Sequence, residues 1–467
     1  MTTATTSHQN ALSAQHDTQQ DVQGALKFIT CGSVDDGKST LIGRLLVDTK
    51  AVLQDQLAGV QRSGETDLAL LTDGLSAERE QGITIDVAYR YFATAKRKFI
   101  IGDAPGHEQY TRNMVTAASS ADAAVVLVDA SKLDWQNPAL ELLPQTRRHS
   151  LLLSLLRVDS IVFAVNKLDA VENAEFAFSN ISAALSKFTS QANIKTTAIV
   201  PISALKGWNV VDAKPGWASY SGPSLLQVLE NLSTTPAETE HAFSFPVQWV
   251  EVLAPTLTTS SASLPPEGAN FPRDGSSENY SPHVKKILPQ GRRIFWGRVA
   301  TGRVQVGQTI TVFPSGKTAT VAQVLDRARR PESVNAGQSA GIVLDREVDV
   351  SRGDWILEKT PAFSSNQEIK ATIAWLDDEP LVAGRAYWAL HGHRWVKAKI
   401  KRVVHKLDIH TLAELEATEL APNDIGHVEI VLQEPIVNAP YSQSRNLGSL
   451  VLVDTASHRT AGAVLIS

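Results

Sequence analysis

Residues 31–40, CGSVDDGKST, contain two glycines, a lysine and a serine in the spacing G-x-x-x-x-G-K-S. The stretch follows the apolar run LKFITC and precedes LIGRLLV, which reads as a helix. Glycines let such a loop wrap its N–H groups around phosphates, and the helix N-terminus adds positive partial charge. We expect Lys38 to reach the β and γ phosphates and Ser39 to bind Mg²⁺. The predicted nucleotide contacts of this loop are Gly32, Ser33, Val34, Asp35, Asp36, Gly37, Lys38, Ser39 and Thr40.

A second polar stretch, GDAPGHEQY, directly follows the apolar run KFII. Asp103 would end that strand and hold Mg²⁺ through a water, and the Gly106 N–H would face a γ-phosphate. His107 is placed to orient an attacking water. A single histidine after a strand is more often simply a polar surface residue, but its distance from the phosphate loop favours the catalytic interpretation. Ala104 and Pro105 complete the predicted nucleotide contacts here.

Two further stretches, NKLD and ISAL, end the apolar runs SIVFAV and TAIVP. The Asp169 carboxylate can accept both N–H donors on the Watson–Crick side of guanine, which adenine lacks. The Asn166 amide stands beside it, and the Lys167 stem can cover a ring face. The ISAL backbone would meet the guanine carbonyl through Ser203, Ala204 and Leu205. Since all four stretches end strands of one predicted parallel sheet, where ligands bind, the predicted nucleotide is GTP.

One more element, AEREQGITIDVAYRYF, contains Thr84 before a strand. This threonine could reach Mg²⁺ and the γ-phosphate when GTP is bound, and release them after hydrolysis. The alternative is an ordinary threonine at a strand edge.

Composition limits the class of protein. The 467 residues suggest about three domains, and 43% hydrophobic with 20% charged residues is typical of a globular protein. The net charge of −5 gives no basic excess for nucleic acid or membrane, although a small basic patch can hide in an acidic total. A single cysteine, Cys31, excludes an intrachain disulfide and fits a reducing cytoplasm. We find no signal peptide and no membrane-spanning run, so we expect a cytoplasmic protein.

The elements that must position these residues change along the chain. Residues 25–240 alternate β-branched apolar runs with amphipathic stretches, which predicts an α/β P-loop GTPase domain with helices on both faces of a parallel sheet. Short strands between glycine-containing turns follow, and they predict two antiparallel β-barrels, 241–362 and 363–467. Residues 253–292, rich in Ser, Pro, Gly and Asn, would be a loop inserted in the first barrel. Residues 1–24 read as a disordered tail.

Together these motifs, followed by two barrels, resemble the translational GTPase superfamily typified by elongation factor Tu over residues 25–467. The resemblance implies that Ser39 and Thr84 are Mg²⁺ ligands and that Asp103 acts through water. It also implies that His107 positions the hydrolytic water and that the NKLD motif reads guanine.

Longer stretches, among them FITCGSVDDGKSTLIGRLLVDTKAV and QTRRHS, resemble the large GTPase subunits of heterodimeric sulfate adenylyltransferases. That family implies that GTP hydrolysis drives ATP and sulfate to adenylylsulfate and pyrophosphate in sulfate assimilation and cysteine biosynthesis. Adenylyl transfer would occur on a small partner subunit. Ala104 departs from the threonine more usual there. Two alternatives remain: an elongation factor Tu-like translation GTPase that binds aminoacyl-tRNA, and a GTP-dependent scaffold with little turnover.

Overall fold

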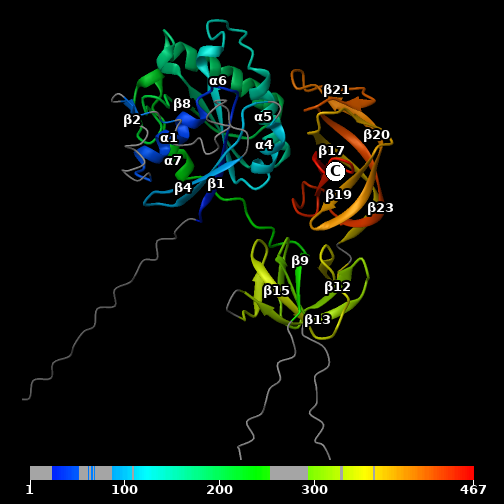
Figure 1. The fold of residues 1–467 in the computed structure, drawn as a ribbon. Helices are drawn as coiled ribbons and strands as arrows, with labels where there is room; N and C mark the ends of the chain where they lie inside the picture. The colour runs from blue at the N-terminus through cyan, green and yellow to red at the C-terminus, as the bar shows by residue number, and fades with distance from the viewer. Residues whose placement is uncertain are drawn as a thin grey trace, which may run out of the picture. The chain divides into compact units, whose positions relative to one another are not determined.

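The computed structural model describes residues 24–51, 61–62, 65–66, 68, 87–107, 110–252, 293–326, 330–360 and 363–467. Thr84, the predicted insertion 253–292 and all but Gly24 of the predicted tail lie outside the described residues. The chain divides into two compact units, one up to Thr235 and one from Pro236 onward (Figure 1). The boundaries predicted for the three domains stay predictions. No described helix is both long and apolar enough to cross a membrane.

The first unit is built on a six-stranded sheet in the order β4-β5-β1-β6-β7-β8. Its strands are β1 (Leu26–Cys31), β4 (Ala88–Ala93), β5 (Lys98–Asp103), β6 (Ala123–Asp129), β7 (Ser160–Asn166) and β8 (Thr196–Pro201). The five strands β5, β1, β6, β7 and β8 run parallel, and β4 joins the edge antiparallel to β5. All seven residues of β6 are buried, as expected for a strand covered on both faces.

Helices cover this sheet because each strand offers apolar residues to both sides. The helices are α1 (Lys38–Asp48), α4 (Thr111–Ala118), α5 (Pro144–Leu155), α6 (Ala174–Gln191) and α7 (Leu225–Glu230). Alternate residues such as Phe28, Val125 and Val162 form one core with Leu41 of α1 and Leu229 of α7. The helices α5 and α6 contribute no residue to this core, and they contact β6 and β8, respectively. This confirms the predicted α/β GTPase architecture.

Short elements complete the first unit: β2 (Gln61–Arg62), β3 (Glu65–Thr66) and the 3₁₀ turns η3 (Ala130–Lys132), η4 (Leu168–Ala170) and η5 (Trp217–Ser219). Cys31 ends β1 as a fully buried side chain. Burial raises the pKa of its thiol to about 12, so this residue is an inert part of the core.

The second unit begins with a closed antiparallel barrel in the order β10-β15-β13-β12-β16-β9. Its strands are β9 (Ser244–Val252), β10 (Arg293–Arg298), β12 (Thr309–Phe313), β13 (Thr318–Leu325), β15 (Ser339–Leu344) and β16 (Trp355–Glu358), with β11 (Arg303–Gln305) paired to β14 (Ser333–Asn335) beside it. The barrel encloses an apolar core that includes Phe243, Phe295 and Ile342. The predicted insertion connects β9 to β10, whose ends Val252 and Arg293 pair directly.

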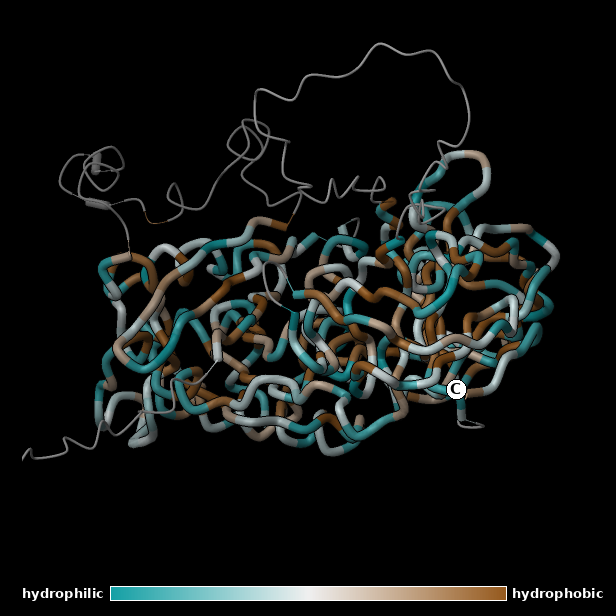
Figure 2. The backbone as a smooth tube through the Cα atoms, turned by 90° about the horizontal axis from the view of Figure 1, so that it is seen from below, coloured by the Kyte–Doolittle hydropathy of each residue, from teal (hydrophilic) through white to brown (hydrophobic). Residues whose placement is uncertain are grey.

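Six longer pairings close a second ring, β19-β24-β25-β17-β23-β20, because β20 also pairs back to β19. Its strands are β17 (Ser364–Trp375), β19 (Ala386–His391), β20 (Arg394–Leu407), β23 (Ile425–Asn438), β24 (Ser449–Asp454) and β25 (Thr460–Ile466). The small strands are β18 (Leu381–Val382), β21 (Glu414–Leu415) and β22 (Glu419–Leu420). Apolar and polar residues alternate along these strands, so one side of each faces the core (Figure 2).

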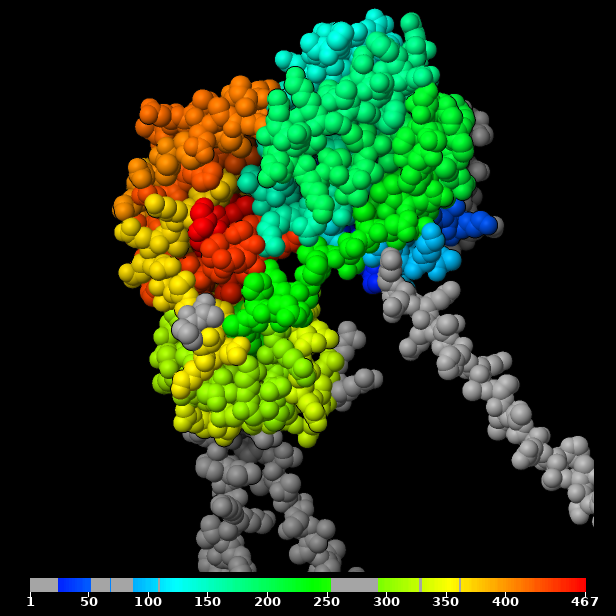
Figure 3. Space-filling model, turned by 180° about the vertical axis from the view of Figure 1, so that it is seen from behind, coloured from blue at the N-terminus to red at the C-terminus, as the bar shows by residue number. Residues whose placement is uncertain are grey.

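Each unit is closely packed in the space-filling view (Figure 3). Within the second unit the two barrels share a small apolar cluster of Ala300, Trp355, Leu357, Val437 and Leu447. The Trp355 indole stacks on the His391 imidazole of β19, with 5.2 Å between ring centroids. This stacking contact therefore links β16 of the first barrel to β19 of the second.

Candidate nucleotide site

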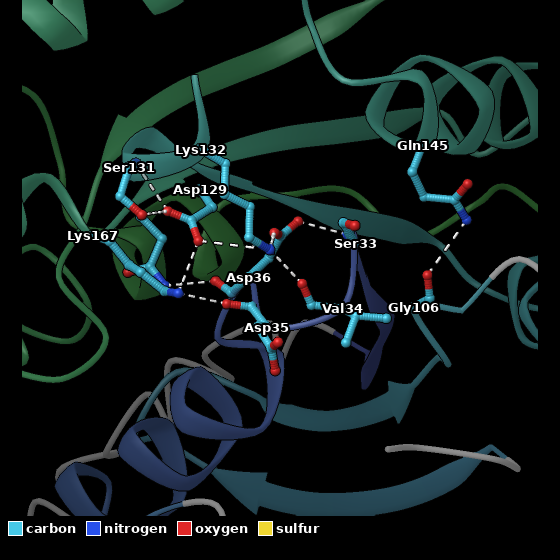
Figure 4. Close-up of polar contacts among 12 residues, drawn as sticks. Ser33, Val34, Asp35, Asp36, Gly106, Asp129, Ser131, Lys132, Gln145 and Lys167 are labelled. Atoms are coloured by element: carbon cyan, nitrogen blue, oxygen red, sulfur yellow. Dashed lines mark hydrogen bonds and ion pairs between the residues drawn. The ribbon is translucent and has the colours of Figure 1, made fainter. Parts of the chain in front are cut away.

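Four loops meet where the parallel strands of the first unit end (Figure 4). The Asn166 side chain, after β7, donates from Nδ2 to the Asp36 carbonyl at 2.8 Å. Its Oδ1 accepts the Ala204 N–H, after β8, at 3.0 Å. Asn166 therefore ties the phosphate loop to both loops predicted to read the base. The fourth loop, which contains Gly106, also lies close to the phosphate loop, because a Cβ on Gly106 would lie 2.3 Å from Lys38 Nζ.

The phosphate loop folds tightly around the Lys38 ammonium. Lys38 Nζ donates to the Ser33 carbonyl at 2.8 Å and to the Gly32 carbonyl at 3.3 Å. Burial lowers the pKa of Lys38, and Asp103 and Asp36 counteract that effect. The loop enters α1 through Gly37, whose φ of 91° favours glycine and where a Cβ would lie 2.5 Å from Asn166 Nδ2. The sequence spacing is thus matched by the strand–loop–helix geometry that it predicts.

Three consecutive carbonyls of the loop point away from its interior. The Val34 and Asp35 carbonyls accept from Lys132 and Lys167, the latter at 2.6 Å (Figure 4). The Asp36 carbonyl accepts from Asn166. A peptide unit is planar and trans, so its carbonyl and the next N–H point in opposite directions. The N–H groups of Asp35 and Gly37 are therefore turned to the other side, whereas the Asp36 N–H donates to the Ser33 carbonyl at 3.4 Å. This arrangement can present both inward N–H groups to an anion.

Asp103 and Ser39 are the two predicted Mg²⁺ ligands that the structure describes. Asp103 ends β5, is 3% exposed and accepts from Thr30 Oγ1 at 3.3 Å. Ser39 lies partly exposed in the first turn of α1. A carboxylate and a hydroxyl are hard oxygen donors, and Mg²⁺ typically takes one or two of these together with phosphates and waters. The donor set therefore fits Mg²⁺; the third predicted ligand, Thr84, is outside the described residues.

His107 follows Gly106 at the exposed side of this loop. Its ring meets the Tyr110 ring edge-on, with 6.1 Å between centroids. Ala104 and Pro105, the preceding predicted contacts, are buried. His107 is therefore exposed, and it directly follows Gly106, whose backbone lies next to Lys38.

Two buried residues of α5, Gln145 and His149, are hydrogen-bonded to each other, and Gln145 also contacts this loop. Gln145 Nε2 lies 2.8 Å from His149 Nε2 and donates to the Gly106 carbonyl at 3.5 Å. Gln145 Oε1 accepts from Arg148 at 3.1 Å. Burial, reinforced by Lys38 and Arg148, lowers the pKa of His149 to about 3. His149 is therefore neutral at physiological pH and can accept from Gln145.

The predicted base-reading residues surround the ends of β7 and β8. Asp169 lies half-buried in η4, one turn beyond Lys167, whose φ is 61°. On the other side, the Ser203 N–H donates to the Trp208 carbonyl at 3.1 Å. Arg44 of α1 binds the carbonyls of Ala204, at 3.2 Å, and Leu205. These contacts fix the shape of the loop that the sequence assigns to the guanine carbonyl.

Sequence reasoning missed three residues that organise the site. Asp129 ends β6, and its carboxylate lies 2.8 Å from Lys167 and 3.8 Å from Lys132. Ser131 also donates to Asp129, through its hydroxyl at 2.6 Å. Lys132 and Gln145 are the other two missed residues. The signal for Asp129 and Lys132 was available, because the run AAVVLVD ends at the same sheet edge as the four recognised loops.

Comparison with known proteins agrees with this geometry. Residues 23–237 match the model of the elongation factor Tu GTP binding domain, and residues 368–467 match the GTP-eEF1A C-terminal domain-like family. Sulfate adenylyltransferase subunit 1 of Aeromonas salmonicida (strain A449) is 41% identical over 96% of this chain and 88% of that protein. The subunit 1 protein of Vibrio atlanticus (strain LGP32) is 42% identical over 96% of this chain and 87% of its own.

A bifunctional enzyme CysN/CysC of Xylella fastidiosa (strain Temecula1 / ATCC 700964) is 41% identical over 95% of this chain, which spans 66% of that longer protein. Among solved structures, sup35 complexed with GDP aligns over 97% of both chains at 19% identity. Its TM-score of 0.39 is too low to support an argument about the fold.

The fold and the site define a GTPase with a GTP-binding domain of the elongation factor Tu type followed by β-barrels. This confirms the fold class predicted from the sequence. The near-complete alignments go further: the chain belongs to the sulfate adenylyltransferase subunit 1 family.

Proposed function

We propose that GTP hydrolysis in this chain drives the conversion of ATP and sulfate to adenylylsulfate and pyrophosphate. Adenylyl transfer takes place on a small partner subunit, with which the chain forms a heterodimer or larger assembly in the cytoplasm. The observation that carries the proposal is the site of four converging loops, in a chain that aligns over 96% of its length with proteins named subunit 1 of this enzyme.

Phosphoryl transfer to water depends mainly on positioning and on neutralising charge. Lys38 supplies positive charge inside the phosphate loop, and the inward N–H groups of Asp35 and Gly37 supply donors. Ser39, Asp103 and the predicted ligand Thr84 would hold Mg²⁺, which when bound neutralises phosphate charge. The Gly106 N–H would face the γ-phosphate, and the close approach of Gly106 to Lys38, where a Cβ would lie 2.3 Å from Nζ, supports this assignment.

His107 positions the attacking water. Its exposed ring, one residue beyond Gly106, leaves it able to turn toward the phosphates. Gln145 and the neutral His149 hold the backbone from which it projects. The guanine base is read by the Asp169 carboxylate and by the loop Ser203–Leu205, and Lys167 covers its face while bound to Asp129 and the Asp35 carbonyl.

The test is phosphate release from GTP by the full chain, with and without the small adenylyltransferase subunit of the same organism, plus ATP and sulfate. We expect turnover that depends on the partner and that accompanies formation of adenylylsulfate. Turnover that ignores partner and sulfate but responds to ribosomes would instead identify a translation factor. GTP binding with negligible turnover under every condition would identify a scaffold.

A further inference from the structure

Asp36 places a carboxylate within the phosphate loop, where an anion is unexpected. Its side chain is fully buried, and Oδ2 accepts the Ser33 N–H at 2.6 Å. An unpaired buried carboxylate is costly and would also repel the phosphates of a bound nucleotide. Lys38, the phosphate-binding lysine, is directed to the carbonyls of Gly32 and Ser33 and forms no direct ion pair with Asp36 among the contacts of the described residues. Lys38 thus acts on Asp36 only through space, and a cation in direct contact would compensate this carboxylate more fully.

Lys132 is that cation. It ends η3, directly after β6, and its Nζ lies 2.9 Å from Asp36 Oδ1. The same ammonium donates to the Val34 carbonyl and lies 3.8 Å from Asp129 Oδ2 (Figure 4). Two carboxylates and one carbonyl thus surround one ammonium. The side chain remains about one-third exposed (34%), so it bridges the surface of the site rather than filling the core.

Besides neutralising Asp36, Lys132 orients the Val34 carbonyl. With the Val34 carbonyl held toward Lys132, the Asp35 N–H points to the opposite side of the loop. Lys167 and Asn166 act in the same way on the next two carbonyls. Lys132 therefore holds the first of three outward carbonyls, and its contact turns the Asp35 N–H inward.

The position of Lys132 in the chain adds a link to the rest of the site. The segment 133–143 follows it and leads into α5, where Gln145 contacts the Gly106 carbonyl. This segment is consequently anchored at one end to the phosphate loop and at the other to the loop that carries His107.

We propose that Lys132 is a positioning residue of the GTP site, which neutralises Asp36 and orients the Val34 carbonyl so that the phosphate loop is preorganised for the nucleotide. This inference rests on the proposed function only in that the loop binds the phosphates of GTP. Lys132 itself needs no contact with the nucleotide.

The experiment is a double-mutant cycle on the full chain, with fluorescent GTP and GDP titrated in the presence of Mg²⁺. K132M should weaken both nucleotides by about tenfold or more, because it leaves a buried carboxylate unpaired. D36N added to K132M should recover a substantial part of that loss, since the uncompensated charge is gone. K132R should bind nearly as wild type. K187M removes an exposed lysine of α6 in the same unit and should change nothing.

Thermal melts accompany each titration, so that a loss of fold is separated from a loss of affinity. Wild-type affinity in K132M would overturn the proposal, and so would an equally weak K132R. A further loss when D36N is added, with the two effects simply multiplying, would also overturn it. Failure of wild type itself to bind GTP would instead count against the proposed function.

Discussion

At the residue scale, we propose that His107, the exposed neighbour of Gly106, positions the attacking water. H107A should slow GTP hydrolysis by about a hundredfold, because the attacking water loses its orientation. GTP affinity should be largely kept, because the phosphate and base loops are untouched. Single-turnover phosphate release and nucleotide titration check the two halves separately. H458A, which removes an exposed histidine of the second unit, is the control. An unchanged hydrolysis rate in H107A would remove His107 from the mechanism.

Base recognition is the second residue-scale prediction. In the proposed site Asp169 would accept the two N–H donors of guanine, whereas xanthine offers a carbonyl in place of the 2-amino group. D169N should therefore weaken GTP binding by about tenfold to a hundredfold and improve binding of xanthosine triphosphate. Competition titrations with both nucleotides measure the change. If D169N binds GTP as wild type does, the NKLD motif does not read the base here.

At the scale of elements, the closest approach in the site joins the loop after β5 to the phosphate loop. A Cβ on Gly106 would lie 2.3 Å from Lys38 Nζ and 2.7 Å from the Gly32 carbonyl. G106A should therefore displace this loop and lower the hydrolysis rate by about tenfold or more, since the approach to the γ-phosphate is disturbed. G384A is a useful comparison, because a Cβ there meets nothing within 4 Å, although its φ of 86° adds local strain. Equal rates for G106A and wild type would show that the contact is dispensable.

The elements also show what the sequence could and could not predict. Each of the four loops was predictable because a polar motif follows an apolar run, and parallel strands bring such ends to one edge. The pairing of Lys132 with Asp36 was not, because the two residues lie 96 positions apart and only the fold brings them together. The antiparallel pairings of β4 with β5 and of β19 with β20 depend on the short turns between Ala93 and Lys98 and between His391 and Arg394, which apolar periodicity does not specify.

At the scale of the whole molecule, each unit contains a fully buried neutral histidine, His149 in the first and His391 in the second. Burial lowers the pKa of His391 from 6.5 to about 4, while its Nε2 lies 3.2 Å from the Leu447 carbonyl. The unfolded chain therefore binds more protons between these two values, and the free energy of unfolding falls as the pH is lowered through that window.

Consequently, lowering the pH from 7 to 5 should cost wild type roughly 2 kcal/mol of unfolding free energy through His391. H391Q should not show this loss, because glutamine does not titrate. The difference in unfolding free energy between wild type and H391Q should therefore become smaller by that amount at pH 5. Urea unfolding followed by tryptophan fluorescence suits this measurement, because Trp355 stacks on His391. H458Q, at an exposed position, should show no such narrowing. A pH-independent difference for H391Q would contradict the neutral state assigned to His391.

The central claim concerns the assembly, in which hydrolysis on this chain drives chemistry on a partner. The most direct measurement is simultaneous quantification of phosphate released from GTP and of adenylylsulfate formed by the chain with its small subunit, ATP and sulfate. We predict that adenylylsulfate rises above its GTP-free equilibrium level only while GTP is hydrolysed, and that H107A or a non-hydrolysable GTP analogue prevents the rise. The same level of adenylylsulfate with GTP, with the analogue and without nucleotide would contradict the account.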